Sequence, residues 1–124
     1  MNSGKQCLVL VALFAAGANA QDDGLKIFIS ADMEGVVGAV TGEQLSPGGF
    51  EYERFRGFMT AEVNAAIDAA RAAGATEFVI ADAHGNGQNL LIEQLPDDVT
   101  IVRSWPRELS MMGGIDDTFD GVIF

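Results

Sequence analysis

The sequence of 124 residues is poor in the residue types that cross-link a chain, stiffen it or attract nucleic acid. Its single cysteine excludes a disulfide within the chain and a cysteine-rich zinc module. Its three prolines are too few for a proline-rich linker. The 7 Lys and Arg residues stand against 18 Asp and Glu residues, which gives a formal net charge of −11. Phosphate backbones repel so acidic a chain, and the composition therefore argues against a nucleic-acid partner.

Long apolar runs are also missing. The longest covers residues 7–16, and its 10 residues are too few for a membrane span, which needs about 20. The run instead has the features of a signal peptide, because Lys5 precedes it and the tripeptide A-N-A at 18–20 resembles a cleavage site. We therefore expect residues 1–20 to be a cleaved signal peptide, and the mature protein to begin at Gln21 and to be secreted or periplasmic. A buried N-terminal helix or strand is the alternative.

From residue 25 onward, patterns typical of strands alternate with patterns typical of helices. Short apolar runs predict buried strands at residues 25–31, 77–81, 99–103 and 121–124. A long helix is expected between the first two strands, because its apolar residues recur at the spacing of one helix face: Tyr52, Phe55, Met59, Val63, Ile67 and Ala70. Gly74 is expected to cap this helix. The remaining segments predict a loop at 35–49, a short helix at 89–95 and a helical turn at 106–112.

This order of elements indicates an α/β fold. A strand, a helix and a further strand in succession favour βαβ crossovers and a mostly parallel sheet, arranged in three layers. We expect the sheet to be incomplete in this chain, because the sequence ends at Phe124 within an apolar strand.

Side chains that can bind metal follow the first two predicted strands. Asp32 and Glu34 come directly after the first strand, and alternate residues of an extended chain point to the same side. Asp82 and His84, the only histidine, come directly after the second strand. The carboxyl ends of parallel strands form the edge where α/β sheets place their ligands, so we expect Asp32, Glu34 and His84 to form one metal site. Asp82 is a candidate fourth ligand or a residue that orients His84.

Each motif also has a simpler interpretation when it is taken by itself. Asp32 and Glu34 can form a solvated acidic turn, and His84 can cap a helix or bond to the backbone. The loop G-N-G-Q-N-L at 85–90 resembles a dinucleotide-binding fingerprint, although Leu90 replaces its third glycine and no acidic residue ends the next strand. A serine or cysteine nucleophile has no support, because G-x-S-x-G is absent and the only cysteine lies in the predicted signal peptide.

Several segments of the sequence, taken in order and spacing, resemble one known family. They are K-I-F-I-S-A-D-M-E-G (26–35), F-M-T-A-E-V-N-A-A-I (58–67), A-D-A-H-G (81–85), N-L-L (89–91) and S-M-M-G-G-I-D-D-T-F-D-G-V-I-F (110–124). Over residues 25–124 the chain is similar to the zinc-dependent D-aminopeptidases associated with bacterial dipeptide-transport operons. The resemblance implies an α/β fold, two zinc ions, hydrolysis of short peptides with an N-terminal D-amino acid, and a ring-shaped homo-oligomer. It also implies that Asp32, Glu34 and His84 are metal ligands, with Asp32 as the bridging carboxylate.

Two features depart from the pattern of that family. The family is usually cytoplasmic, whereas this chain carries a predicted export signal. A further histidine ligand, a glutamate ligand and a catalytic histidine are expected after Phe124, so no catalytic residue is assigned within this chain. We therefore expect residues 21–124 to be the N-terminal part of an α/β metallopeptidase domain. There are two alternatives. One is an exported module that binds a cation or an amine without catalysis, and the other is a nucleotide-binding α/β domain.

Overall fold

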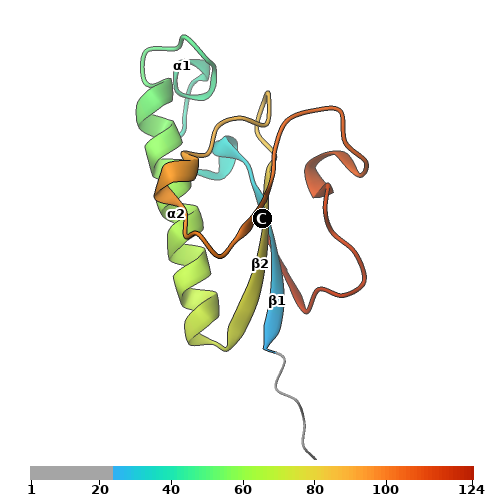
Figure 1. Cartoon of the computed structure of the whole chain (residues 1–124). Helices are drawn as coiled ribbons and strands as arrows, with labels where there is room; N and C mark the ends of the chain where they lie inside the picture. The colour runs from blue at the N-terminus through green and yellow to red at the C-terminus, as the bar shows by residue number, and fades with distance from the viewer. Residues whose placement is uncertain (1–23) are drawn as a thin grey trace, which may run out of the picture.

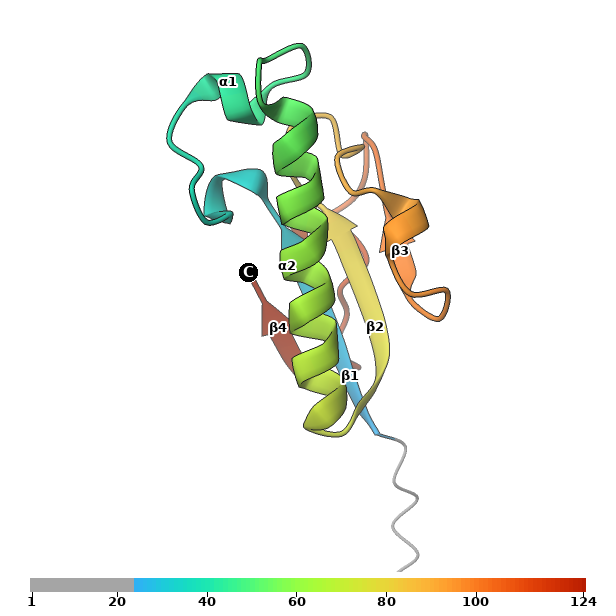
Figure 2. The ribbon, with the colours of Figure 1, turned by 90° about the vertical axis from the view of Figure 1, so that its left-hand side faces the viewer.

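The computed structural model describes residues 24–124, which form a parallel sheet covered on both faces. The predicted signal peptide at 1–20 lies outside the described residues. The strands in the described part are β1 (Leu25–Ala31), β2 (Ala75–Asp82), β3 (Thr100–Val102) and β4 (Gly121–Ile123). Figure 1 shows the central strands β1 and β2 side by side. The four strands pair in the order β3-β2-β1-β4, and every pair is parallel (Figure 2). The predicted α/β class and parallel sheet are confirmed.

One face of the sheet is covered by the long helix α2 (Tyr52–Ala72), which connects β1 to β2 (Figure 2). Its buried apolar side chains are the ones that the spacing predicted: Tyr52, Phe55, Met59, Val63 and Ile67. They pack against alternate residues of β1 and β2. Gly74 follows the helix with a φ of +101°, a conformation that glycine adopts without steric cost. No helix in residues 24–124 is both long and apolar enough to cross a membrane.

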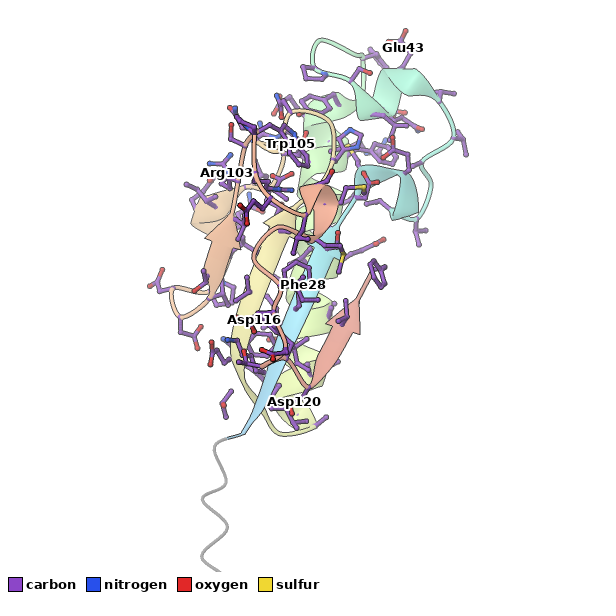
Figure 3. All side chains as sticks on the ribbon, turned by 90° about the vertical axis from the view of Figure 1, so that its right-hand side faces the viewer. Phe28, Glu43, Arg103, Trp105, Asp116 and Asp120 are labelled. Carbon is purple, nitrogen blue, oxygen red and sulfur yellow. The ribbon has the colours of Figure 1, made fainter. Side chains whose placement is uncertain are left out.

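The opposite face is covered by the irregular segment between β3 and β4. Figure 3 views this face, with Phe28 of β1 near its centre and Asp116 and Asp120 in the covering segment. Phe28 is fully buried and meets the ring of Phe119 edge to face, with 5.5 Å between the ring centroids. Because alternate residues of β1 point to opposite faces, one short strand contributes to both apolar clusters.

The structure differs from the sequence expectations in two connecting segments. The segment 35–49, predicted as a loop, contains the single-turn helix α1 (Gly42–Leu45). The prediction of a helix over residues 89–95 was wrong, because that stretch contains only the 3-10 turn Ile92–Gln94. Its first backbone N–H groups donate to the side chains of Asp82 and Thr60, and this competes with helical hydrogen bonding.

Candidate metal centre

The pairing of β1 with β2 brings the two predicted motifs together. Ala31 and Asp82, the last residues of these strands, are partners in the register. The pairing continues one step further, because the N–H of Ala83 donates to the carbonyl oxygen of Ala31 at 2.8 Å. Asp32 and His84 therefore leave the same edge of the sheet from neighbouring strands.

The two acidic residues reach this edge by a different backbone route than the sequence predicted. Only Asp32 is extended, with φ −131° and ψ 133°. Glu34 lies in the 3-10 turn Met33–Gly35, so the expected alternation of an extended chain was wrong there. The turn forms because Met33 turns inward and is fully buried in the core. It still leaves the Glu34 carboxylate beside His84.

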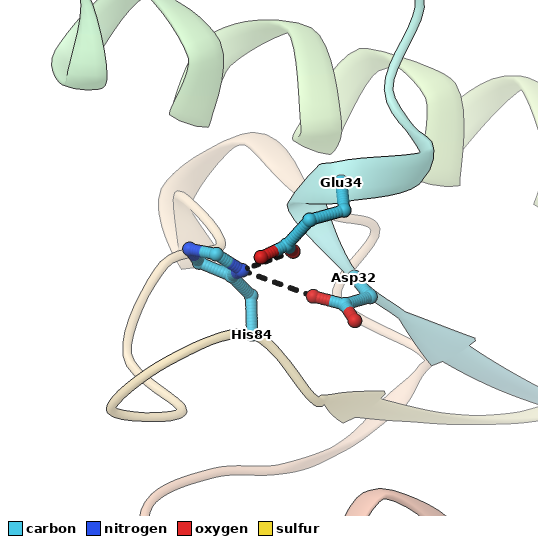
Figure 4. Close-up of side chains that lie close together, drawn as sticks. All are labelled: Asp32, Glu34 and His84. Atoms are coloured by element: carbon cyan, nitrogen blue, oxygen red, sulfur yellow. Dashed lines mark hydrogen bonds and ion pairs between the residues drawn. The ribbon is translucent and has the colours of Figure 1, made fainter. Parts of the chain in front are cut away.

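Asp32, Glu34 and His84 converge on one point (Figure 4). His84 Nδ1 lies 3.0 Å from Asp32 Oδ1 and 2.7 Å from Glu34 Oε2. Each of the three residues offers one ligand atom, and these atoms all lie within 4.8 Å of one another. The imidazole is buried, whereas the Glu34 side chain is 58% exposed, so the cluster opens to solvent on the glutamate side. The structure thus brings together the three residues that the sequence proposed as ligands.

The donor chemistry of this cluster fits a metal such as zinc. His84 Nε2 lies 2.6 Å from the carbonyl oxygen of Leu45, which can only accept a hydrogen bond. A neutral imidazole must therefore carry its proton on Nε2, and the Nδ1 lone pair then faces two carboxylate oxygens. Three electron pairs directed at one point repel one another unless a cation lies between them. Nitrogen and carboxylate oxygen are ligands that zinc accepts.

The charges within the cluster also act on one another. Burial raises the pKa of Asp32, and the adjacent Glu34 carboxyl raises it further. The pKa of Glu34 is lowered, first by its contact with Asp32. Burial by itself lowers the pKa of His84, but the Leu45 carbonyl and the two carboxylates outweigh it and raise that pKa. The two carboxylates thus shift each other's pKa in opposite directions, and both favour a positive charge on His84.

Asp82 does not join this group, although the sequence made it a candidate ligand. Its side chain is fully buried, and its carboxylate accepts the N–H groups of Asn89 and Leu90. Sequence analysis also missed the Leu45 carbonyl that binds His84. The available signal was the pattern T-x-x-Q at 41–44, which is typical of a helix start, and Gln44 Oε1 indeed accepts the N–H of Thr41 at 3.0 Å.

The structure does not support the dinucleotide-binding interpretation of residues 85–90, because no helix in the described part of the chain begins directly after these glycines. Such a fingerprint needs a helix N-terminus directly after the glycines. In the described chain the stretch after Gly87 is irregular up to the 3-10 turn Ile92–Gln94. The geometry therefore favours the metal site at this edge of the sheet.

A parallel α/β sheet that carries two carboxylates and an imidazole at the carboxyl ends of its central strands defines an α/β protein with a candidate metal centre. Comparison with known proteins identifies the family of this chain. The chain belongs to the D-aminopeptidase family, peptidase M55, whose model matches residues 25–124. The resemblance seen in the sequence is thereby confirmed.

A curated sequence and a solved structure, both from Bacillus subtilis, show how far the similarity extends. A D-aminopeptidase of strain 168 is 36% identical over 100 residues, which cover 81% of this chain and 36% of the relative. A solved structure, the zinc-dependent D-aminopeptidase DppA, described as a self-compartmentalizing protease, matches with a TM-score of 0.76 and 36% identity. That match covers 79% of this chain and 36% of the solved chain. The chain thus spans about a third of the length of these relatives.

Proposed function

We propose that the protein containing this chain is a metal-dependent aminopeptidase that hydrolyses short peptides with an N-terminal D-amino acid. The observation that carries the proposal is the convergence of Asp32, Glu34 and His84 in a chain of the D-aminopeptidase family. The zinc dependence stated for the relative DppA supports zinc as the metal, and we propose two ions per subunit.

In this proposal each residue of the cluster has a definite task. Asp32, Glu34 and His84 would hold the metal, with Asp32 in contact with both ions. The Leu45 carbonyl keeps the His84 proton on Nε2 and so keeps Nδ1 free to bind. When bound, zinc supplies an acidified water and a positive charge that polarises the peptide carbonyl. Catalytic zinc takes about three protein ligands per ion, so two ions need ligands from outside this cluster, as does the proton transfer.

We further propose that the protein forms a homo-oligomer and acts outside the cytoplasm. Support for the first point is the description of DppA as self-compartmentalizing. Support for the second is the signal-peptide pattern at residues 1–20. Its substrates would then be short D-amino-acid peptides in the periplasm or outside the cell.

The function is tested by a hydrolysis assay on the protein produced from its complete gene. We expect release of D-alanine from D-alanyl-D-alanine, loss of this activity with a chelator, and its return with Zn²⁺. L-alanyl-L-alanine serves as the matched substrate and is expected to react much more slowly. A protein that binds zinc tightly but hydrolyses neither dipeptide would instead be a binding module.

A further inference from the structure

A fully buried side chain with no task in the proposed mechanism, Asn89, contacts the backbone of His84. Its amide nitrogen donates to the carbonyl oxygen of His84 at 2.5 Å and to Oδ1 of Asp82 at 2.8 Å. One amide group thereby ties the residue that carries the imidazole to the last residue of β2. These two hydrogen bonds link the ends of the segment 82–84, and the backbone conformation of this segment sets the direction of the His84 imidazole.

The amide of Asn89 is itself held in one orientation from two sides. On the helix side, the hydroxyl group of Tyr52 donates to Asn89 Oδ1 at 2.6 Å. On the strand side, Asp82 Oδ1 accepts from the side-chain amide, and Asp82 Oδ2 accepts the backbone N–H groups of Asn89 and Leu90 at 2.5 and 2.8 Å. Because Oδ1 is occupied by Tyr52, the NH₂ group must face Asp82 and His84. The two hydrogen-bond donors on the amide of Asn89 therefore have defined acceptors.

The loop that carries His84 needs such a constraint. Gly85 and Gly87 follow the histidine with φ values of +51° and +68°, and glycine leaves the backbone more conformational freedom than any other residue. Apart from its imidazole, His84 is held at its carbonyl group, which accepts from Asn89 and from the N–H of Gly87 at 2.8 Å. Trp105 Nε1 and the N–H of Ser104 hold the carbonyl groups of Gly85 and Gly87, each at 2.8 Å. Without Asn89, the carbonyl group of His84 itself would keep only the hydrogen bond from Gly87.

We propose that Asn89 is a positioning residue for the metal centre: it fixes the backbone of His84 so that Nδ1 faces Asp32 and Glu34. This inference rests on the proposed metal site. Residues that orient metal ligands contribute about 10- to 100-fold to metal affinity, although they never touch the metal. Asn89 performs this function through the main chain of the ligand rather than through its ring.

The test compares Asn89→Ala with Thr60→Val in the protein produced from its complete gene. Thr60 is equally buried, and its hydroxyl forms hydrogen bonds with the backbone at Arg56 and Leu91 rather than with His84, so it is a matched control. Zn²⁺ affinity is measured by competition with a chelator, the Co²⁺ absorption spectrum reports the ligand geometry, and thermal unfolding of the metal-free protein reports stability. We expect Asn89→Ala to weaken zinc binding about 10- to 100-fold and to change the Co²⁺ spectrum. Thr60→Val should lower the unfolding temperature without either effect.

Two further variants keep the proposal falsifiable. Asn89→Asp preserves the shape and the acceptor for Tyr52 but can donate at most one hydrogen bond, so it should also weaken zinc binding, even if Asn89→Ala does not fold. His84→Ala tests the site itself. If His84→Ala loses zinc while both Asn89 variants bind it as the unmodified protein does, the positioning role is wrong and the metal site stands. If His84→Ala binds zinc normally, the metal site is wrong.

Discussion

At the residue scale, His84 is held at both nitrogens of its ring. Nε2 meets the Leu45 carbonyl oxygen, and Nδ1 meets the carboxylates of Asp32 and Glu34. An imidazole with one nitrogen committed to a carbonyl has one tautomer when neutral, which leaves the other nitrogen ready to bind a cation. The buried ring and the more exposed carboxylates together form a site that a metal ion can enter from solvent.

Replacement of Asp32 by alanine tests the assignment of the bridging ligand. If Asp32 bridges the two zinc ions that we propose, we expect Asp32→Ala to remove zinc binding and the peptidase activity. This loss would be larger than the roughly 10- to 100-fold typical of residues that only orient ligands. Metal analysis of the purified protein and the D-alanyl-D-alanine assay provide the measurements. Asp117→Ala, which removes an exposed carboxylate elsewhere, is the control. A normal zinc content in Asp32→Ala would refute the assignment.

At the scale of elements, the site depends on β1, α2 and β2 as one unit. The helix lies along the two central strands and buries one apolar face against them (Figure 2). Its polar face carries ion pairs such as Arg54 with Glu51 and Arg56 with Glu53, at 2.9 and 3.0 Å. Exposed pairs of this kind add little stability, so the packed face of α2 is what holds the strand ends in register.

The contribution of this packing is measured by Ile67→Ala. Ile67 is fully buried in the α2 face, so the variant loses both transfer free energy and packing, and we expect the free energy of unfolding to fall by about 2–5 kcal/mol. The neighbouring Asp68 is exposed, and Asp68→Ala should change the free energy of unfolding by no more than about 0.5 kcal/mol. Urea unfolding monitored by circular dichroism measures both values. Equal stability of the two variants would contradict the assigned face.

At the scale of the whole molecule, the described residues hold one group of possible metal ligands, with three members. The two zinc ions that we propose would need more ligands than these. The chain spans 36% of the length of the Bacillus relatives, and their activity is therefore proposed for the protein that contains it rather than for these residues alone.

The 124-residue chain, produced by itself, is accordingly expected to bind zinc weakly and to show no peptidase activity. The reason is the ligand count, since Asp32, Glu34 and His84 can complete the protein ligands of about one ion. Equilibrium dialysis with Zn²⁺ and the D-alanyl-D-alanine assay measure the two properties. Chelator-sensitive hydrolysis by this chain would show that no further ligands are needed.

Export is a separate prediction about the whole molecule. Lys5, the apolar run at 7–16 and the A-N-A tripeptide predict cleavage after Ala20. N-terminal sequencing of the protein recovered from outside the cytoplasm should therefore begin at Gln21. Replacing the small residues at 18 and 20 with large ones should slow cleavage. A mature protein that begins at Met1 would overturn the prediction.

Local patterns in the sequence were sufficient for α2, for the strands β1 and β2, and for the three residues that converge at the candidate site. The apolar spacing of α2 and the short runs of β1 and β2 are local properties, because helix and strand periodicity depend on residues a few positions apart. The βαβ order then made β1 and β2 probable neighbours, and this placed Asp32 near His84. The pairing in the structure confirms this placement.

Only the tertiary structure decided how the site is held. Leu45 binds His84 across 39 residues, and Tyr52 binds Asn89 across 37, so no local spacing could indicate either contact. Asp82 had the same sequence signal as the ligands, a carboxylate directly after a strand, yet it turns inward to pair with Asn89. The physical reason is that a buried polar group requires a partner, and which partner it meets depends on the packing of α2 and the loops against the sheet.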